Sequence, residues 1–302
     1  MKYLLAGSAL ALALAAAPTH AALRVMACEP EWAALAQELG GPLVEATSAT
    51  TALQDPHHVQ ARPSLIARMR NADVVVCTGA ELEAGWLPML LQQSGNAKVQ
   101  PGQPGNFAAA DFVRKLDVPA SVDRSQGDVH AAGNPHVQTD PRNIAAVARA
   151  LTTRLQQVDA ANASDYAQRG AAFQQKWQQA MARWTTQAAP LRGVAVVSQH
   201  KGYVYMHDWL GLKEVAVLEP KPGVEPSAAH LQSVLATLKS NPAQMVVYSA
   251  YQDPRPAEWL SRNASLPAVK LPFTVGGSDA ARDLAGLFDD TLNRLLTAAA
   301  AR

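Results

Sequence analysis

The chain has 302 residues, of which 48% are hydrophobic and 17% charged, and its formal net charge is +1. This length accommodates two domains of ordinary size, roughly 100–150 residues each. The near-zero net charge excludes a typical nucleic-acid-binding protein, which would present a strongly basic face.

The first 22 residues have the features of a secretory signal peptide. Lys2 supplies a positive charge, an apolar run follows from Leu4 to Ala17, and small residues surround a cleavage site that we expect near Ala21 or Ala22. The apolar run is too short to span a bilayer, which takes about 20 residues. A buried first helix is the less favoured interpretation. We therefore expect an exported, periplasmic protein.

The first half of the mature chain alternates apolar strands with helices, which is typical of a parallel α/β sheet. We expect strands over 23–28, 43–48 and 72–77, and helices over 31–39, 63–71 and 81–93. The segment 94–135 is rich in proline and glycine, so we expect loops there around one short strand near 113–118. A helix with apolar residues at helical spacing follows over 141–158.

A long amphipathic helix is predicted over 165–189, between the two halves of the chain. It would be nearly 40 Å long, at about 1.5 Å per residue. Tyr166, Phe173, Trp177 and Trp184 recur along it at multiples of helical spacing. Such an aromatic stripe is typical of a helix packed on a core, and its position at mid-chain predicts a stiff connector.

The second half repeats the alternation of strands and helices. We expect strands over 193–198, 213–218, 245–249 and 268–271, and helices over 200–209, 227–239, 257–263 and 279–300, the last of them capped by Ser278. The predicted fold is α/β, with two lobes that are each a mostly parallel sheet flanked by helices, joined by one long connecting helix. The expected boundaries are 1–22 for the signal peptide, 23–161 for the N-terminal lobe, 162–189 for the connecting helix and 190–302 for the C-terminal lobe.

Two cysteines, Cys28 and Cys77, each end an apolar strand. In an oxidising compartment such a pair can form a disulfide. Two buried free thiols are an equally good interpretation of the sequence.

Three histidines occupy similar places in the predicted fold. His57 and His136 each follow a proline in a loop that leads to a helix, and His200 follows the buried strand GVAVVSQ. Ligands of open parallel sheets collect at the carboxyl ends of strands, and imidazole is the commonest ligand of zinc and neighbouring metals. The pattern favours a transition-metal site, although a single histidine of this kind would be read as a polar loop residue.

Four segments together resemble blocks of one protein family. They are DPHHVQARPSLIARMRNADVVVCTGAELEAGW from Asp55, NPHVQTDPRNIAAVARAL from Asn134, VVSQHKGYVYMHDWLGL from Val196 and GVEPSAAHL from Gly223. The chain resembles the zinc and manganese solute-binding proteins of bacterial ABC importers, the class with two lobes and a connecting helix. The resemblance covers essentially the whole mature chain. Asn134 stands where the family usually has Asp, and a histidine-rich loop is missing.

The resemblance implies four metal ligands, which are His57, His136, His200 and a carboxylate in the C-terminal lobe. By position that carboxylate is Asp279, with Asp253 as the fallback, although Asp279 could also act only as a favourable charge at a helix N-terminus. The implied cargo is Zn²⁺, with Mn²⁺ possible. The implied partner is an ABC permease in the inner membrane, and we expect a monomer without enzymatic activity.

The other histidines of the mature chain have weaker signals, and two alternative functions are considered less favoured. We expect His58 to be solvated or to support the site. His130 is expected to be solvated, with shuttling of the metal as the alternative, and His207 and His230 are expected to lie at the surface. A zinc hydrolase would need an open coordination position and a general base, and the sequence has no HExxH helix. A carrier of haem, siderophore or cobalamin on the same fold is the other alternative, in which the histidines would be incidental.

Overall fold

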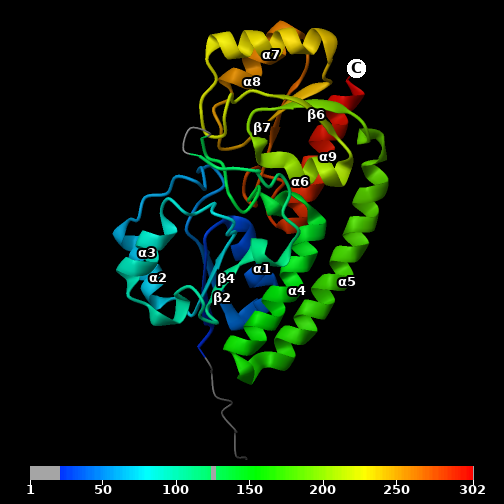
Figure 1. Cartoon of the computed structure of the whole chain (residues 1–302). Coiled ribbons are helices and arrows are strands. Elements are labelled where there is room, and N and C mark those ends of the chain that lie inside the picture. The colour runs from blue at the N-terminus through cyan, green and yellow to red at the C-terminus, as the bar shows by residue number, and fades with distance from the viewer. Residues whose placement is uncertain (1–20, 124–126, 302) are drawn as a thin grey trace, which may run out of the picture.

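A computed structural model of the chain describes residues 21–123 and 127–301; the expected signal peptide lies almost wholly outside them. Within these residues the strands form two four-stranded parallel sheets, one in each half of the chain (Figure 1). The sheets have equivalent strand orders, β2-β1-β3-β4 and β6-β5-β7-β8. The predicted α/β fold with two lobes is therefore confirmed.

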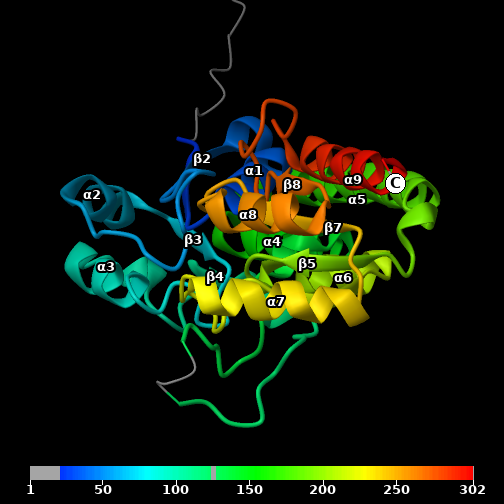
Figure 2. The same ribbon diagram turned by 90° about the horizontal axis from the view of Figure 1, so that it is seen from above.

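The N-terminal sheet has helices on both of its faces. Its elements are β1 (Leu23–Ala27), α1 (Pro30–Gly40), β2 (Val44–Ser48), α2 (Pro63–Asn71), β3 (Val74–Cys77), α3 (Leu87–Ser94), β4 (Asn106–Ala108) and α4 (Pro141–Val158). Because side chains alternate along a strand, Val74 and Val76 pack toward α1 and α4, whereas Val75 and Cys77 pack toward α2 and α3. Figure 2 shows these two layers of helices on opposite sides of the sheet.

The C-terminal sheet is built in the same way. Its elements are β5 (Ala195–Ser198), α6 (Val204–Leu210), β6 (Lys213–Val217), α7 (Ala228–Ser240), β7 (Met245–Ser249), α8 (Arg255–Ala264), β8 (Ala268–Leu271) and α9 (Leu284–Ala300). Val197 and Val246 pack with apolar residues of α7 and α8, and Val196 and Val247 face the side of α6 and α9.

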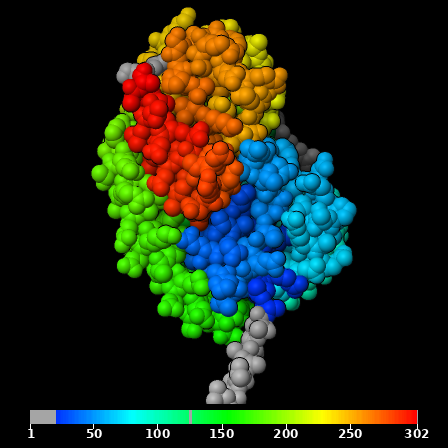
Figure 3. Space-filling model, turned by 180° about the vertical axis from the view of Figure 1, so that it is seen from behind, coloured from blue at the N-terminus to red at the C-terminus, as the bar shows by residue number. Residues whose placement is uncertain are grey.

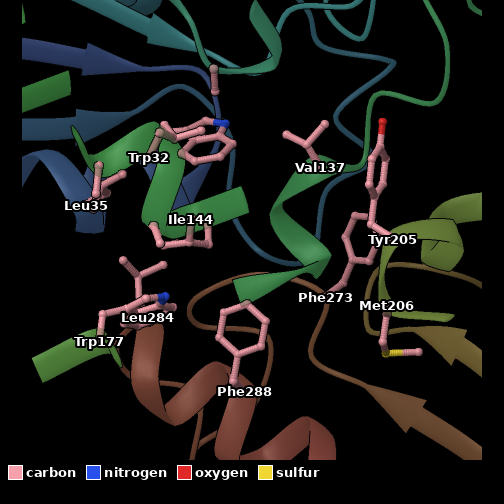
Figure 4. Packing of buried hydrophobic residues seen from close by; sticks show 14 of the residues in the cluster. Trp32, Leu35, Val137, Ile144, Trp177, Tyr205, Met206, Phe273, Leu284 and Phe288 are labelled. Atoms are coloured by element: carbon pink, nitrogen blue, oxygen red, sulfur yellow. The ribbon is translucent and has the colours of Figure 1, made fainter. Parts of the chain in front are cut away.

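The connecting helix, α5, runs from Ala163 to Gln187 and packs along both lobes. Trp177 and Trp184 contact Phe288 of α9, with ring centroids 5.6 and 5.2 Å away. Figure 4 shows residues of α4, α5 and α9 in one apolar cluster, and Figure 3 shows α9 against α5 on the outer face. One continuous core thus joins the lobes, and opening them would expose this apolar surface to water.

The two cysteines are joined in a disulfide, which the sequence left open. Cys28 directly follows β1, and Cys77 is the last residue of β3. These two strands are neighbours in the N-terminal sheet. Both side chains are buried. Backbone bonds from Ala49 to Ala27 and from Thr50 to Cys28 continue the pairing beyond the strands. The disulfide therefore closes the end of the sheet from which the loop with His57 departs.

Several predicted boundaries are wrong, each for a local reason. The strand expected near 113–118 is instead the three-residue β4, which pairs with β3 and is too short to show a periodic pattern. The helix expected from 81 begins at Leu87, because Ala80 and Glu81 adopt φ values of 49° and 69° in a tight turn. α9 begins after Asp283, which caps it by accepting a bond from Gly286 N at 2.8 Å.

None of the helices within residues 21–123 and 127–301 is both long and apolar enough to cross a bilayer.

Candidate metal centre

His57 lies in the loop after β2, and its neighbours hold it in place. The His57 backbone N–H donates to Asp55 Oδ1 at 2.9 Å, and the ring Nδ1 lies 2.7 Å from the same oxygen. Trp86 Nε1 donates to the carbonyl of Pro56 at 2.9 Å. The Asp-Pro turn and the indole together point the His57 ring inward, where its Nε2 is buried and has no hydrogen-bond partner among the described residues.

His136 is the most buried of the three predicted ligands, at 1% exposure. Its backbone N–H donates to Asn134 Oδ1 at 3.1 Å. Asn134 also reaches the other lobe, because its Nδ2 donates to the carbonyl of Lys201 at 2.7 Å and its own carbonyl accepts from Tyr205 Oη at 2.6 Å. Asn134 therefore fixes the His136 loop against the C-terminal lobe.

His200 follows β5 and is oriented by a carboxylate from the next strand end. Its Nδ1 lies 2.7 Å from Oε2 of Glu219, which follows β6 and also accepts a bond from Gly223 N at 2.9 Å. A carboxylate that accepts the Nδ1 proton of a histidine leaves the lone pair of Nε2 free for a metal, an arrangement typical of metal-binding histidines. Asp55 does the same for His57.

The structure brings these three histidines together. One ring nitrogen from each of His57, His136 and His200 lies within 4.8 Å of the others, and the three residues are only 1–8% exposed. Nε2 of His136 lies 3.2 Å from Nε2 of His200. Two imidazole nitrogens on one tetrahedral zinc ion, with Zn–N distances of about 2.0–2.1 Å, lie about 3.3–3.4 Å apart. The donor atoms therefore fit a small transition-metal ion.

The electrostatics of the centre favour the neutral form of His136, which is the form of an imidazole that binds metals. Burial lowers the pKa of His136 well below its usual value, and the neighbouring His57 and His200 lower it further. Burial opposes ionisation of Asp55, but the hydrogen bonds and charge of His57 lower the pKa of its carboxyl overall. His136 thus stays unprotonated, while Asp55 stays charged beside the cluster.

The structure does not bring Asp279 to the histidines. Asp279 is exposed in a turn closed by a bond from Gly276 N to the Ala281 carbonyl, and its own carbonyl accepts from Arg282 Nε at 2.8 Å. The expected cap, Ser278, instead donates to Asp290 Oδ2 at 2.6 Å. Because α9 starts later than predicted, the carboxylate that was expected at its first turn is carried outward.

The fallback carboxylate, Asp253, is engaged elsewhere. It lines a cavity of about 240 Å³ that reaches His57 and His200. Its Oδ2 accepts from Arg255 Nε at 2.6 Å, and this pair lowers the pKa of the Asp253 carboxyl. Asp253 lies near the centre, but its carboxylate forms an ion pair with Arg255.

Two other histidines differ from the sequence-based expectation. His130, expected to be solvated, is half-buried and stacks on His57 with a centroid distance of 5.5 Å. Its Nε2 is buried and has no hydrogen-bond partner among the described residues. His207 of α6, expected at the surface, is buried, and burial lowers its pKa to about 4. His58 is mostly exposed, as expected, whereas His230 is partly buried on α7.

Sequence reasoning missed Glu219 and Asp55 as orienting groups. The rule that located His200 also applies to Glu219, because both follow neighbouring parallel strands at the same edge of the sheet. The sequence indicates Asp55 only as part of an Asp-Pro turn. The close approach of His130 comes from a loop that has no periodic pattern.

One further group in the described part of the chain has metal-ligand residue types close together, namely Cys28, Cys77 and Glu83. Its two sulfurs are joined to each other, so neither can act as a thiolate ligand. The histidine cluster is the stronger candidate.

The chain is similar in sequence to known proteins of metal uptake and transport. The family described as zinc-uptake complex component A, periplasmic, matches residues 25–298. The manganese ABC transporter substrate-binding lipoprotein PsaA of Streptococcus pneumoniae is 21% identical over 257 residues, covering 83% of this chain and 80% of its own. The high-affinity zinc uptake system protein ZnuA of Paracoccus denitrificans is 24% identical over 281 residues, covering 82% of each chain.

The fold is also similar to solved structures. A crystal structure of ZnuA superposes with a TM-score of 0.73 at 20% identity, covering 91% of this chain and all of that one. At this identity the likeness supports the architecture, with two parallel-sheet lobes and a long helix between them.

Proposed function

Because the chain belongs to the family of periplasmic zinc-uptake complex component A proteins, we propose that it binds a divalent transition metal through His57, His136 and His200. The observation that carries the proposal is the set of three buried imidazoles whose ring nitrogens lie within 4.8 Å of one another. Two of them are oriented by the carboxylates of Asp55 and Glu219. A single small ion is the ligand that this arrangement suits.

Zinc is the cargo that we propose first. Nitrogen-rich ligation and the usual affinity order both favour zinc over manganese. The named relatives include both a manganese-binding and a zinc-uptake protein, so their names do not choose between the two metals. Manganese therefore remains the alternative cargo.

The family works in transport. Its members are substrate-binding proteins of ABC transporters, which act with a membrane permease and its ATPase, and they are not enzymes. The family is periplasmic. For this chain we propose secretion with cleavage near Ala21 or Ala22, a monomer, delivery to a permease in the inner membrane, and lobes spanning 23–161 and 190–302 around a connecting segment 162–189.

We propose that the ion enters and leaves through the loops around the centre. The continuous core across α4, α5 and α9 opposes a wide separation of the lobes. Cavities of about 410 and 240 Å³ reach the histidines from the loops that follow the strands. The second cavity is lined by Asp55, Asp128, Glu219 and Glu225, among others, and such a concentration of carboxylates attracts cations.

The proposal is tested by metal analysis of the purified mature protein, followed by competition titrations with zinc and manganese. We expect one tightly bound ion per chain, tighter binding of zinc, and loss of the site in His200→Ala. The control is His230→Ala, which changes a histidine on α7 outside the cluster. Absence of a stoichiometric site in the wild type, or equal binding by His200→Ala and the wild type, would contradict the proposal.

A further inference from the structure

The metal centre has three clustered imidazoles, and a fourth lies against it. Resting on the proposed function, we propose that His130, and not Asp279, is the fourth protein ligand of the bound metal. His130 lies in the loop that precedes His136, on the side of the 410 Å³ cavity. Nothing in the motifs that indicated His57, His136 and His200 assigns it a role.

The spacing of the rings supports this assignment. The three ligand pairs have centroid distances of 5.2, 5.6 and 5.3 Å, and His57 and His130 lie 5.5 Å apart with nearly parallel rings. His130 therefore approaches His57 as closely as the other ligands do. Its nitrogens are not within the 4.8 Å group, so the ring has to move inward when the metal binds.

The free donor atom of His130 points to the same role. Its Nε2 is buried without a hydrogen-bond partner among the described residues, as is Nε2 of His57. A buried polar atom without a partner is unfavourable unless a water or an ion satisfies it. A metal ion at the cluster would satisfy both atoms.

The loop that carries His130 is anchored to both lobes. On one side, Glu81 Oε2 accepts a bond from Ala131 N at 2.6 Å. On the other, Asp128 N donates to the carbonyl of Pro222 at 2.9 Å. These bonds hold His130 over the centre from its two flanks.

The turn that presents Glu81 is strained. Ala80 and Glu81 both have positive φ, at 49° and 69°, which costs free energy for residues other than glycine. Glu83 stabilises this turn by accepting bonds from the N–H groups of Thr78 and Gly79 at 2.7 and 3.1 Å. The strained backbone thus occurs at the turn that presents Glu81, which anchors the His130 loop.

Four of the nearby carboxylates have other partners. Asp55 and Glu219 bind the Nδ1 atoms of His57 and His200, and Asp253 pairs with Arg255. Asp128 lies 3.7 Å from His58 Nε2. Unlike these four carboxylates, His130 offers a donor atom without giving up an existing contact. Four neutral nitrogens would favour zinc over manganese more strongly than three nitrogens and a carboxylate.

The test compares three single variants of the mature protein, His130→Ala, His58→Ala and Asp279→Asn. His58 is the matched control, because its ring also neighbours His57, at 6.3 Å, but is 69% exposed. Zinc affinity is measured by competition titration, and X-ray absorption at the zinc edge counts the coordinating imidazoles. We expect four imidazoles in the wild type, His58→Ala and Asp279→Asn, and three in His130→Ala, with zinc binding weakened roughly tenfold or more in that variant alone.

Two outcomes would overturn the assignment. One is three imidazoles in the wild type with unchanged affinity in His130→Ala, and the other is loss of affinity in Asp279→Asn with His130→Ala unaffected. A variant that releases the loop, Glu81→Ala, should weaken zinc binding less than His130→Ala and leave four imidazoles at saturating zinc. If His57→Ala also bound zinc normally, the proposed function itself would fail, and this result is distinguishable from the other two.

Discussion

The two lobes have equivalent strand orders but use the ends of equivalent strands differently. In the N-terminal lobe, the chain after β1 continues into Cys28 and the buried Glu29, and the ligand His57 follows β2. In the C-terminal lobe, the ligand His200 follows β5 directly, and Glu219 after β6 orients it. The ligand thus follows β2 in one lobe and β5, the counterpart of β1, in the other, and Asp55, which orients His57, lies in the same loop as its ligand.

This difference shows how each lobe fixes its ligand. His200 lies two residues beyond the end of β5, so the sheet itself positions it. His57 lies nine residues beyond the end of β2, on a loop that needs separate restraints. The N-terminal lobe supplies them through the disulfide, the Trp86 contact with Pro56 and the bond from Thr50 to Cys28.

The largest expected effect on metal binding comes from removing one ligand from either lobe. Zinc held by four protein ligands has a binding free energy of roughly 10–16 kcal/mol, so one ligand contributes on the order of 3 kcal/mol. We expect His57→Ala and His200→Ala each to lose roughly 100-fold or more in zinc affinity, measured by competition titration. A large loss in one variant with no loss in the other would show that a single lobe holds the ion.

The disulfide should stabilise the protein strongly. Its sequence separation is 49 residues, and closing a loop of that length stabilises the folded state by about 4 kcal/mol in the chain-entropy description. We expect the Cys28→Ser/Cys77→Ser double variant to lose stability of this order in urea unfolding of the metal-free protein. An unchanged unfolding midpoint would show that the N-terminal strand ends need no such restraint.

The buried acids of the N-terminal lobe should make stability depend on pH. Burial raises the pKa of Glu31 to about 7, although the hydroxyl of Thr274 donates to it and opposes the rise. Between the unfolded value of about 4.5 and pH 7, the folded protein holds a proton that the unfolded chain has lost, so this group makes stability fall as pH rises.

The variant Glu31→Gln isolates this contribution, because glutamine has a similar shape and does not titrate. From pH 5 to pH 8, the free energy of unfolding of this variant should rise relative to that of the wild type by on the order of 1–3 kcal/mol. Urea unfolding of both proteins at both pH values measures this difference. A stability difference that is constant with pH would contradict the assignment of a raised pKa to Glu31.

A smaller effect on metal binding than the loss of a ligand is expected from the orienting carboxylates. Losing such a partner typically costs 10–100-fold in metal affinity. We expect Glu219→Gln and Asp55→Asn to weaken zinc binding by roughly this factor, with similar values for both lobes. Titration of the two variants side by side tests whether the supports are equivalent. Wild-type affinity in both variants would show that the carboxylates do not act on the metal through the histidines.

The sequence predicted most of the fold because most elements carry strong periodic patterns. The strand with residues Val74 to Val76 is apolar throughout, and the aromatic stripe of α5 marked a packed helix whose bounds, Ala163–Gln187, differ from the prediction by two residues at each end. β4 could not be predicted, since three residues paired to β3 show no periodicity.

The site was predicted in part for a similar reason. Proline-containing loops indicated His57 and His136, and the strand before it indicated His200, whose position follows from the topology of a parallel sheet. The position of Asp279 depended on where α9 begins, and Asp283 caps the helix instead of Ser278. The position of His130 depends on the bonds of its loop to Glu81 and Pro222, which lie 50 and 94 residues away in sequence from their partners Ala131 and Asp128. No local pattern reports such contacts.

The central claim is that the two lobes share one metal ion between His57, His136 and His200. The most direct measurement is an anomalous difference map from crystals of the zinc-loaded mature protein, recorded at the zinc absorption edge. We predict one strong peak per chain within bonding distance of a nitrogen of each of the three histidines. A peak elsewhere, or a peak bound to the histidines of only one lobe, would contradict this account.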